Sequence, residues 1–466
     1  MPHTHVAGSI HADAMASRPT WLVRPDDLNW LNPALWPAGV ERAGDGAMTL
    51  VGRPLTELTE QFGSPAYFVD EAEFRARARA FAQAFDDWDV YYAGKAFLCR
   101  GVARWIDQEG LGLDVCSGNE LMVALRAGFP PHRIGFHGNN KSLAELRLGL
   151  EAGVGHVIVD SLDEIERIEA LAQELDVKAK VLVRVTTGVE AHTHEYIATA
   201  HEDQKFGFSI LGGHALMALV RCQTSPWIDL AGVHSHIGSQ IFETDAFQVA
   251  AQRTMRVMAQ FRDATGTNLA ELNLGGGFGI AYTADDTPPT PAGLKDSLSL
   301  IVERARADYD LGQLRLAIEP GRAICGPAMV AVYTVGTVKV VELDGGAQRV
   351  YVAVDGGMSD NIRPALYAAE YSALLANRAS SAPPALCRVV GKHCEGGDIL
   401  VRDVFLPADI APGDLIAVPA AGAYARSMAS NYNYLARPPV VAVDAERAYP
   451  LLRRETLDDL LALDLG

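Results

Sequence analysis

Short apolar runs alternate with amphipathic stretches along the chain from Val90 to Arg322. Each run ends in polar residues or glycine, which is typical of buried strands that stop at a turn. Eight such runs are present, and we expect each to form a strand: residues 90–96, 112–117, 134–139, 157–161, 180–186, 230–239, 271–277 and 316–322.

Between these runs, apolar residues recur at spacings of three and four, which predicts amphipathic helices. Ser142 and Ser161 stand where a helix N-cap is needed, and Gly128 and Gly153 stand where a helix should stop. Eight strand–helix units over about 230 residues predict a (β/α)8 TIM-type barrel. A doubly wound sheet also alternates strands with helices, but it usually has fewer strands.

The pattern changes after Arg322, where most strand-like runs follow one another without long helical stretches between them. We expect residues 326–466 to form a mainly antiparallel β-sandwich or β-barrel domain. Residues 21–70 are expected to pair with that domain, because chain ends often meet. Residues 71–325 would form the barrel, and residues 1–20 a mobile tail. The predicted fold class is therefore α/β.

The composition limits the classes of function. With 466 residues and 49% hydrophobic content, the chain can bury a large core. Its formal net charge of −18, without a long basic run, argues against nucleic acid or an anionic membrane as a partner. The sequence has no apolar run of about 18 residues, and its N-terminus does not resemble a signal peptide.

The six cysteines are scattered, and no pair has CxxC spacing. This distribution fits a reducing cytoplasm better than a disulfide scaffold or a zinc knuckle, so we expect a cytoplasmic protein. His192, His194 and His201 lie in a long predicted loop, and solvated or structural roles account for them more simply than a metal site does. We expect no bound metal.

Unusual residues gather at the ends of the predicted strands, where barrel enzymes place their chemistry. Lys95 follows the first run in apolar company, and burying its ammonium without a partner would be costly. Glu319 closes the last run, where it could form a structural ion pair with Arg322 or Lys95. Asp114 and the sequence HGNN from residue 137 end two further runs.

Residues 275–279, with the sequence GGGFG, form either a flexible turn or a phosphate-binding loop. Glycine lets backbone N–H groups approach an anion, and the loops after strands seven and eight are the usual phosphate site of a barrel. His234 and His236 flank Ser235 on the sixth predicted strand. We expect the two histidines to point to opposite sides, with one of them facing the barrel mouth.

An amine, a glycine loop and a buried acid at one rim suggest pyridoxal 5'-phosphate as the cofactor. Lys95 would form a Schiff base with its aldehyde, so that no free ammonium is buried. Glu319 would pair with the ring nitrogen, an interaction worth up to ~4 kcal/mol at ~4 Å and an effective dielectric constant of ~20. His236 would stack on the ring, and Asp114 is a candidate for orienting Lys95 or a ring substituent.

Ten motifs occur in order: YYAGKA, DVCSGNEL, HGNNKS, EDQKFGFS, HSHIGSQI, LNLGGGFGI, EPGR, IRPALY, CEGGD and GAYARSMASNYN. They resemble the diaminopimelate decarboxylase family, which belongs to the alanine-racemase-like, fold type III group of pyridoxal-phosphate enzymes. The resemblance covers nearly the whole chain and implies a (β/α)8 barrel plus a β domain. Asn119 and Gly396 depart from the family pattern, and neither is expected to touch the chemistry directly.

The resemblance implies a role for each matching residue around the cofactor. Lys95 would be the Schiff-base lysine, His236 would stack on the ring, and Glu319 would pair with the ring nitrogen. Backbone groups of the glycine loop and the Ser239 side chain would hold the phosphate. The implied cofactor-binding set is Lys95, His236, Ser239, Gly275, Gly276, Gly277, Glu319, Gly321, Arg322 and Tyr424.

The resemblance also implies the reaction, which converts meso-2,6-diaminopimelate to L-lysine and CO2 as the last step of lysine biosynthesis. Cys394 would deliver a proton to the substrate carbon, and the other cysteines would be structural. In the family, Cys394 and Glu395 enter the site from the partner subunit, which implies a homodimer with shared active sites. The distal amino-acid end of the substrate would be bound by Arg322, Arg363, Tyr367, Glu395 and Tyr424.

The same residues disfavour three rival functions. Arg363 and the glutamate of CEGGD disfavour a related decarboxylase that acts on arginine, ornithine or carboxynorspermidine. A racemase or epimerase is disfavoured because Cys394 takes the place of a catalytic tyrosine. A non-catalytic relative would have lost Lys95 or Cys394, and both are present.

Overall fold

The computed structural model describes residues 22–189, 204–343 and 347–466. The predicted tail and His192, His194 and His201 lie outside these residues. The chain forms two compact units. The barrel unit contains residues 75–279 and 288–324, and the sheet unit contains the residues up to Phe74 together with 280–287 and 325–466.

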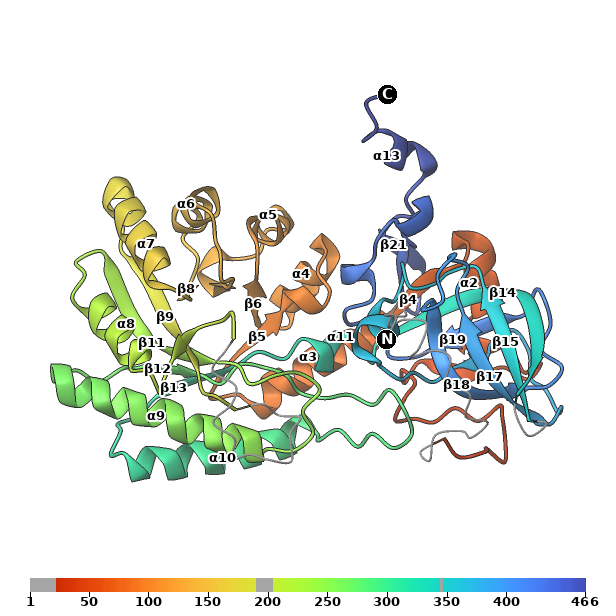
Figure 1. Ribbon diagram of the computed structural model, residues 1–466, viewed down its shortest axis with the longest axis horizontal. Helices are drawn as coiled ribbons and strands as arrows, with labels where there is room; N and C mark the ends of the chain where they lie inside the picture. Colours follow the sequence, from red (N-terminus) through yellow and green to blue (C-terminus); the bar gives the residue numbers. More distant parts are fainter. Residues whose placement is uncertain (1–21, 190–203, 344–346) are drawn as a thin grey trace, which may run out of the picture. The chain divides into compact units, whose positions relative to one another are not determined.

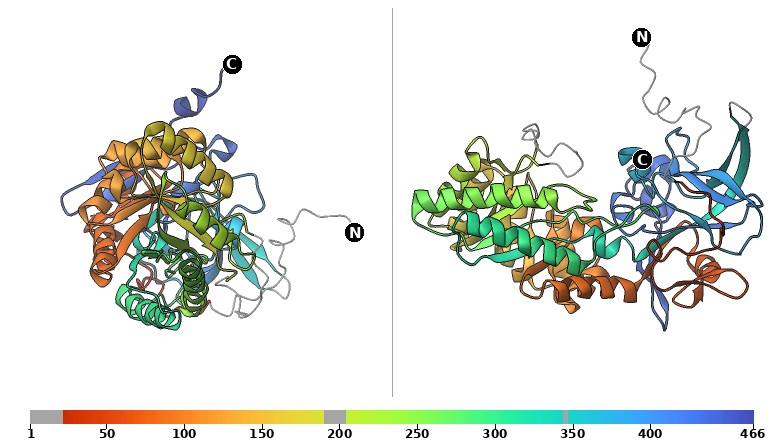
Figure 2. Two further views of the ribbon diagram at one scale, coloured as in Figure 1. Left: turned by 90° about the vertical axis from the view of Figure 1, so that its left-hand side faces the viewer. Right: turned by 90° about the horizontal axis from the view of Figure 1, so that it is seen from below.

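Eight parallel strands of the described chain close into a barrel. Each strand pairs with the next, β8 pairs with β9, and β13 pairs with β5 to complete the circle. Helices ring these strands in the left view of Figure 2. The predicted (β/α)8 barrel is thus confirmed, and the doubly wound sheet is excluded. The strands are β5 (Asp89–Ala93), β6 (Gly112–Val115), β7 (Ile134–Phe136), β8 (His156–Val159), β9 (Ala179–Thr186), β11 (Ile228–Ser235), β12 (Glu271–Asn273) and β13 (Arg315–Ile318).

Three of the barrel helices begin or end at the predicted signals. The Ser142 and Ser161 side chains each accept a hydrogen bond from a backbone N–H in the first turn, and Gly128 and Gly153 end their helices in the left-handed conformation. The barrel helices named here are α4 (Arg100–Gln108), α5 (Gly118–Ala127), α6 (Leu143–Ala152), α7 (Leu162–Leu175), α8 (His214–Gln223), α9 (Asp245–Thr265) and α10 (Pro291–Asp308) (Figure 1).

The first barrel strand ends earlier than predicted. It stops at Ala93, and a short 3-10 turn, η1 (Gly94–Ala96), follows it. A Cβ atom on Gly94 would lie 2.7 Å from the carbonyl oxygen of Asp114, so glycine allows this turn to pass close to β6. The turn carries the Lys95 side chain out of the strand, and Lys95 is exposed rather than buried in the core.

The sheet unit is built around the long strand β14 (Met329–Glu342). β14 pairs in antiparallel fashion with β4 (Ala66–Asp70), β15 (Gln348–Val354) and β19 (Leu415–Val418). The β15–β17 and β4–β20 pairings are parallel, so the sheet is mixed rather than purely antiparallel. Its buried residues include Phe68, Val330 and Val441. The other strands of this sheet are β16 (Leu374–Leu375), β17 (Pro384–Val390), β18 (Ile399–Pro407), β20 (Val440–Val443) and β21 (Ala448–Leu452).

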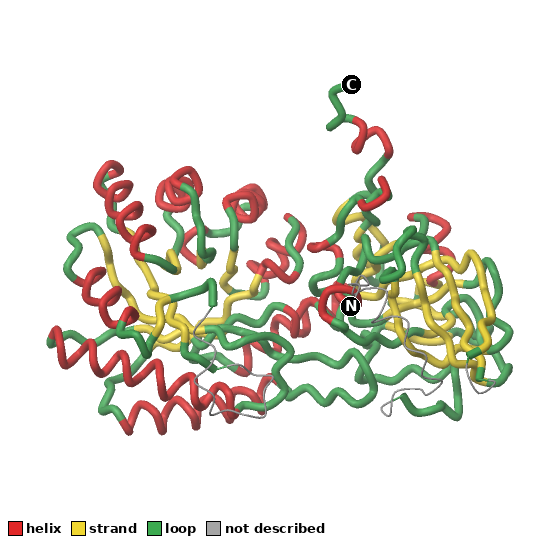
Figure 3. The backbone as a smooth tube through the Cα atoms, viewed as in Figure 1, coloured by secondary structure: helices red, strands yellow, loops and turns green. Residues whose placement is uncertain are grey.

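Further elements complete the described chain, and Figure 3 distinguishes helices, strands and loops by colour. Among the described residues, no helix combines the length and the apolar character needed to span a bilayer. The remaining elements are β1 (Val40–Arg42), β2 (Met48–Leu50), β3 (Arg53–Pro54), α2 (Leu55–Phe62), α3 (Glu71–Ala84), β10 (Phe208–Ser209), α11 (Arg322–Cys325), α12 (Arg363–Tyr367), α13 (Leu457–Leu461) and the 3-10 turns η2 (Pro131–Arg133), η4 (Arg426–Met428) and η5 (Tyr432–Tyr434).

Candidate active site

A cavity of about 640 Å³ lies at the C-terminal ends of the barrel strands. Lys95 follows β5, His137 follows β7, Arg184 lies on β9, His236 follows β11 and Glu319 follows β13, and all five line this cavity. The fold therefore brings together polar residues that are spread over more than two hundred positions of the sequence, from Lys95 to Glu319.

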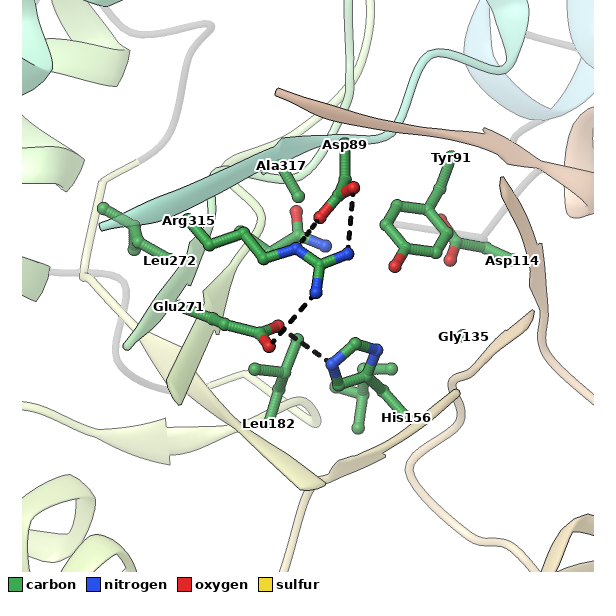
Figure 4. A pocket seen from close by; sticks show the side chains of 12 residues that line it. Asp89, Tyr91, Asp114, Gly135, His156, Leu182, Glu271, Leu272, Arg315 and Ala317 are labelled. Carbon is green, nitrogen blue, oxygen red and sulfur yellow. Dashed lines mark hydrogen bonds and ion pairs between the residues drawn. The ribbon is translucent and has the colours of Figure 1, made fainter. Parts of the chain in front are cut away.

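The cavity at the opposite end of the barrel is only about 10 Å³. Asp89, His156, Glu271 and Arg315 each begin a barrel strand there. Their side chains pair with one another across this end, as Figure 4 shows. The charged residues at the N-terminal ends thus pair with one another, whereas the C-terminal end has the room for a ligand.

His234 and His236 both line the larger cavity, so the expectation that they point to opposite sides was wrong. Side chains alternate along a strand, and residues two apart therefore share a face. His234 lies within β11 and is buried, whereas His236 follows the strand and is only partly buried. Both imidazoles belong to the candidate site.

Glu319 is buried, and three nitrogen atoms meet at its Oε1 atom. His234 Nε2 lies 3.0 Å away, His137 Nε2 lies 3.4 Å away, and Asn273 Nδ2 donates a hydrogen bond of 2.8 Å. Burial alone would raise the pKa of this carboxyl, but the two histidines outweigh burial and lower the pKa. Glu319 is therefore held as an anion.

Asp114, on β6, is buried beside the same group. Its Oδ1 atom lies 3.3 Å from His137 Nε2, so His137 stands between two carboxyl groups. Burial and the charge of Glu319 raise the pKa of Asp114 well above its ordinary value. Burial also lowers the pKa of His137 to about 4. The negative charge of this group thus resides on Glu319, while Asp114 stays protonated.

The glycine loop begins where β12 ends. A Cβ atom on Gly276 would lie 2.0 Å from the carbonyl oxygen of Glu319, and φ is +73° at Gly275 and +103° at Gly277. Side chains are therefore excluded at all three positions. Asn273 ties the loop to the buried acid, because its Oδ1 accepts a 2.8 Å hydrogen bond from the Gly275 N–H while its Nδ2 donates to Glu319.

Ser239 and Arg322 meet in the barrel unit, where Arg322 Nη2 donates a 2.8 Å hydrogen bond to Ser239 Oγ. Arg322 begins α11 and is 9% exposed. A Cβ atom on Gly321 would lie 2.9 Å from Ala93, so the chain passes close to the end of β5 at this point. Residues predicted for phosphate and carboxylate binding are thus in direct contact.

The other predicted site residues belong to the sheet unit. Arg363 begins α12 and is buried, and its guanidinium lies 4.5 Å from the centre of the Tyr282 ring. It also donates a hydrogen bond to the Tyr371 hydroxyl. Tyr424 is half-buried with a φ of +59°, whereas Tyr367 is exposed. Arg363 is therefore a firmly held cation that suits recognition of a carboxylate.

Cys394 and Glu395 are exposed on the loop between β17 and β18. The base of this loop is anchored at His393, whose Nε2 lies 2.8 Å from Ser359 Oγ. The Asp398 carboxylate accepts a 2.7 Å hydrogen bond from the backbone N–H of His393. The Cys394 thiol is therefore exposed on a loop, and hydrogen bonds hold the preceding residue, His393, in place.

Sequence reasoning gave no role to several residues in the site or next to it. His137 lies in the motif HGNNKS and Asn273 in the motif LNLGGGFGI, but the resemblance implied no role for either residue. Lys141 is fully buried, where its Nζ lies 2.6 Å from Glu164 Oε1. Cys116, expected to be structural, is exposed and lines the cavity that contains Lys95.

The cavity fits pyridoxal phosphate by its residue types and by its size. It offers an amine at Lys95 for the aldehyde, an anion at Glu319 for the ring nitrogen and an imidazole at His236 for a ring face. The volume of about 640 Å³ lies in the range of ligand pockets. The glycine loop adds backbone N–H groups beside the same carboxylate.

Comparison with known families supports this interpretation of the barrel. The family model described as "Pyridoxal-dependent decarboxylase, pyridoxal binding domain" matches residues 71–326. The match includes all eight barrel strands and the cavity. The chain belongs to this family of pyridoxal-dependent decarboxylases, and its cofactor is pyridoxal phosphate.

Curated relatives narrow the class. The diaminopimelate decarboxylase of Mycobacterium tuberculosis is 52% identical over 445 residues, which cover 94% of this chain and 100% of the relative. That of Mycobacterium leprae is 49% identical and covers 99% and 100%, and that of Bacillus subtilis is 45% identical and covers 90% and 95%. Within the pyridoxal-dependent decarboxylases, the chain therefore belongs to the diaminopimelate decarboxylase family.

Solved structures agree with this placement. Diaminopimelate decarboxylase from M. jannaschii in co-complex with L-lysine has a TM-score of 0.85 at 31% identity, and the alignment covers 93% and 99% of the two chains. A lysine/ornithine decarboxylase from Vibrio vulnificus complexed with putrescine has a TM-score of 0.68 at 25% identity, with 84% and 98% covered. The fold class and the enzyme class predicted from the sequence are confirmed.

Proposed function

We propose that this enzyme converts meso-2,6-diaminopimelate to L-lysine and CO2, the last step of lysine biosynthesis. The observation that carries the proposal is the cavity in which the amine of Lys95 and the carboxylate of Glu319 lie together. Curated relatives up to 52% identical to this chain are named for this activity, and the alignments cover nearly their whole length.

The residues around the cavity have complementary roles toward the cofactor. Bound pyridoxal phosphate would supply an aldehyde that captures amines and a ring that delocalises the electron pair left on the substrate carbon when CO2 departs. Lys95 provides the amine that holds the cofactor, and Glu319 keeps its ring nitrogen protonated. His236 contacts a ring face, and the glycine loop and Ser239 bind the phosphate. Gly321, Arg322 and Tyr424 complete the proposed cofactor site.

Selectivity for diaminopimelate requires groups that bind an amino acid at both ends of the substrate. Arg322 and Arg363 provide guanidinium groups for the distal carboxylate, and both side chains are buried. Glu395 provides a carboxylate for the distal ammonium, with Tyr367 and Tyr424 beside the bound chain. A diamine precursor such as ornithine lacks the distal carboxylate and leaves a buried guanidinium unmatched, which disfavours its binding.

Cys394 delivers the proton that replaces CO2 on the substrate carbon. A thiol is a usable acid near neutral pH, and this one is exposed on an anchored loop. We further propose that the enzyme is a cytoplasmic homodimer, in which the partner subunit's Cys394 and the partner subunit's Glu395 complete each active site. Six free cysteines fit a reducing compartment.

The decisive experiment mixes the purified protein with pyridoxal phosphate and meso-diaminopimelate and measures lysine and CO2. Lys95→Ala is the control and should give neither product. Arginine, ornithine and carboxynorspermidine are tested in parallel, and faster CO2 release from any of them would overturn the proposed substrate. Retained CO2 with scrambled stereochemistry would indicate an epimerase instead.

A further inference from the structure

Side chains from three strand ends surround one oxygen atom of the Glu319 carboxylate. His234 comes from β11, Asn273 ends β12, and His137 follows β7, yet all three place a nitrogen atom within 3.4 Å of Oε1. These side chains are almost completely inaccessible, with exposures of 1% for His234, 4% for Asn273 and 6% for His137. Such a convergence fixes the position of the carboxylate and not only its charge.

The orientation of Asn273 follows from its second hydrogen bond. Its Oδ1 accepts the Gly275 N–H at 2.8 Å, so its Nδ2 must face Glu319. Because Nδ2 can only donate, Oε1 of Glu319 must accept. The same asparagine therefore links the glycine loop to the buried acid.

The two histidines fix each other. Their rings pack edge to face, with centres 5.0 Å apart and an angle of 74° between their planes. His137 is braced on its other side by Asp114, whose Oδ1 lies 3.3 Å from His137 Nε2. Neither imidazole can turn without disturbing the other or one of the two carboxyl groups.

We propose that His137 and His234 are positioning residues that hold Glu319 by Oε1 and so leave its Oε2 atom for the ring nitrogen of the cofactor. This inference deepens the proposed function and rests on it. The two imidazoles act through Glu319 and have no reaction step of their own. The other charged or ionisable side chains that share the cavity with Glu319 are Lys95, Asp114, Cys116, Arg184, Lys205 and His236.

Two alternative roles for the histidines lead to different predictions. In the first, they are ordinary buried residues that only stabilise the barrel. In the second, they bind a metal ion, since donor atoms of His137, His234 and Glu319 all lie within 4.8 Å of one another. The Asn273 N–H that points at the same Oε1 disfavours a cation at that atom.

The test compares His234 with a matched histidine at the other end of the barrel. His156 is also buried, and its Nε2 lies 2.8 Å from Glu271 Oε2 (Figure 4). Leucine and glutamine are introduced at both positions in the full-length, cofactor-loaded protein, and the same two changes are made at His137. Leucine removes the polar contact, whereas glutamine retains a donor.

For His234→Leu and His137→Leu we expect kcat to fall about 10- to 100-fold, as for other residues that orient a primary ligand. KM should change much less. The pH at which the visible absorption of the bound cofactor changes should fall by about one unit, because a displaced anion stabilises the ring proton less. His234→Gln should recover most of the kcat that His234→Leu loses, and reverse most of the shift in the pH of the absorption change.

His156→Leu should lower the melting temperature and leave the cofactor spectrum and kcat unchanged. If His234→Leu and His137→Leu behave in the same way, the histidines are only structural and the inference is wrong. Stoichiometric zinc retained by the loaded wild-type enzyme would also overturn it. Failure of the proposed function would look different, because the wild-type protein itself would then not release CO2 from diaminopimelate.

Discussion

Burial and neighbouring side chains set the charge states of the two carboxyl groups in the cavity. Lys95 remains accessible because a glycine turn lifts it out of its strand. Glu319 stays ionised because two imidazoles and an amide face it, while burial keeps Asp114 protonated. Two acids within reach of one histidine thus have opposite charge states, which is a common arrangement at catalytic sites.

Replacing Asp114 by asparagine tests whether Asp114 is protonated in the folded protein. The folded protein holds the pKa of Asp114 above its ordinary value of 3.8, so the wild type loses stability as the pH rises from that value toward the raised pKa. Asp114→Asn has no such loss, and its free energy of unfolding should improve relative to the wild type as the pH rises from about 4 to about 7. Urea unfolding of the cofactor-free protein at several pH values measures this difference.

A relative stability of Asp114→Asn that falls over the same pH range would contradict the raised pKa. The cofactor-loaded variant answers a second question. If its visible spectrum is identical to that of the wild type, Asp114 does not orient Lys95 or a ring substituent.

Replacing Cys394 by alanine tests the proton donor. We expect cofactor binding to survive while turnover falls by about 100- to 10,000-fold, the range for loss of a general acid. Cofactor titration and kcat on diaminopimelate measure the two properties. Cys116→Ala must be compared with it, because Cys116 is also exposed and lines the cavity. A large loss in Cys116→Ala with near-normal turnover in Cys394→Ala would transfer the role to Cys116.

At the scale of strands and loops, one end of the barrel is closed by paired charges and the other end contains the candidate active site. The N-terminal ends carry charges that pair with one another around a cavity of about 10 Å³, whereas the C-terminal ends surround about 640 Å³. The glycine loop at the functional end packs so closely on Glu319 that side chains are excluded from it. Close backbone packing therefore fixes the loop that is proposed to bind the phosphate.

Gly276→Ala is expected to disturb both the loop and the buried acid. The added Cβ would lie 2.0 Å from the Glu319 carbonyl oxygen, and one of the two segments must move. We expect a destabilisation of about 1–3 kcal/mol and weaker cofactor binding. Thermal unfolding and cofactor titration measure these effects. Gly312→Ala is the control, since nothing lies within 4 Å of its added Cβ. Equal behaviour of the two variants would show that the loop tolerates a side chain.

Glu271→Gln tests the closed end of the barrel. Burial would raise the pKa of Glu271, but His156 and Lys180 outweigh it and lower the pKa from 4.5 to about 2. The charge therefore stabilises the fold above pH 4.5, and this contribution is lost as the pH falls toward 2. We expect the variant to be about 1–3 kcal/mol less stable at pH 7, with the difference shrinking in acid. A difference that is independent of pH would contradict an ionic role.

Periodicity predicted the barrel because each strand and helix has its own pattern in the sequence. The same reasoning could not find the Glu319–Asn273 hydrogen bond, because it joins residues that are neighbours only once the barrel has closed. Lys141 was missed for a related reason. Its partner Glu164 lies on α7, beyond α6 and β8, so periodicity does not distinguish this buried lysine from a solvated one. The motif resemblance supplied residues such as Cys394, which periodicity alone leaves without a role.

At the scale of the whole molecule, the proposed chemistry is divided between the two compact units. The barrel unit contains the amine of Lys95 and the carboxylate of Glu319, while the sheet unit contains Cys394 and the buried guanidinium of Arg363. Decarboxylation requires the amine, and protonation requires the thiol. If subunits share active sites as we propose, the two functions can be supplied by different copies of the chain.

Mixing two inactive variants tests this sharing. In a hybrid dimer of Lys95→Ala and Cys394→Ala, one site would combine an intact Lys95 with the partner subunit's Cys394, while the other site would lack both groups. After subunit exchange, an equal mixture should recover about a quarter of the wild-type activity, because half of the dimers are hybrids with one working site. Lys95→Ala mixed with Glu319→Gln is the matched control. Both changes lie in the barrel unit, so the hybrid has no intact site and should stay inactive. If the first mixture also stays inactive although a tagged subunit shows that exchange is complete, Cys394 serves its own chain and the shared site is excluded.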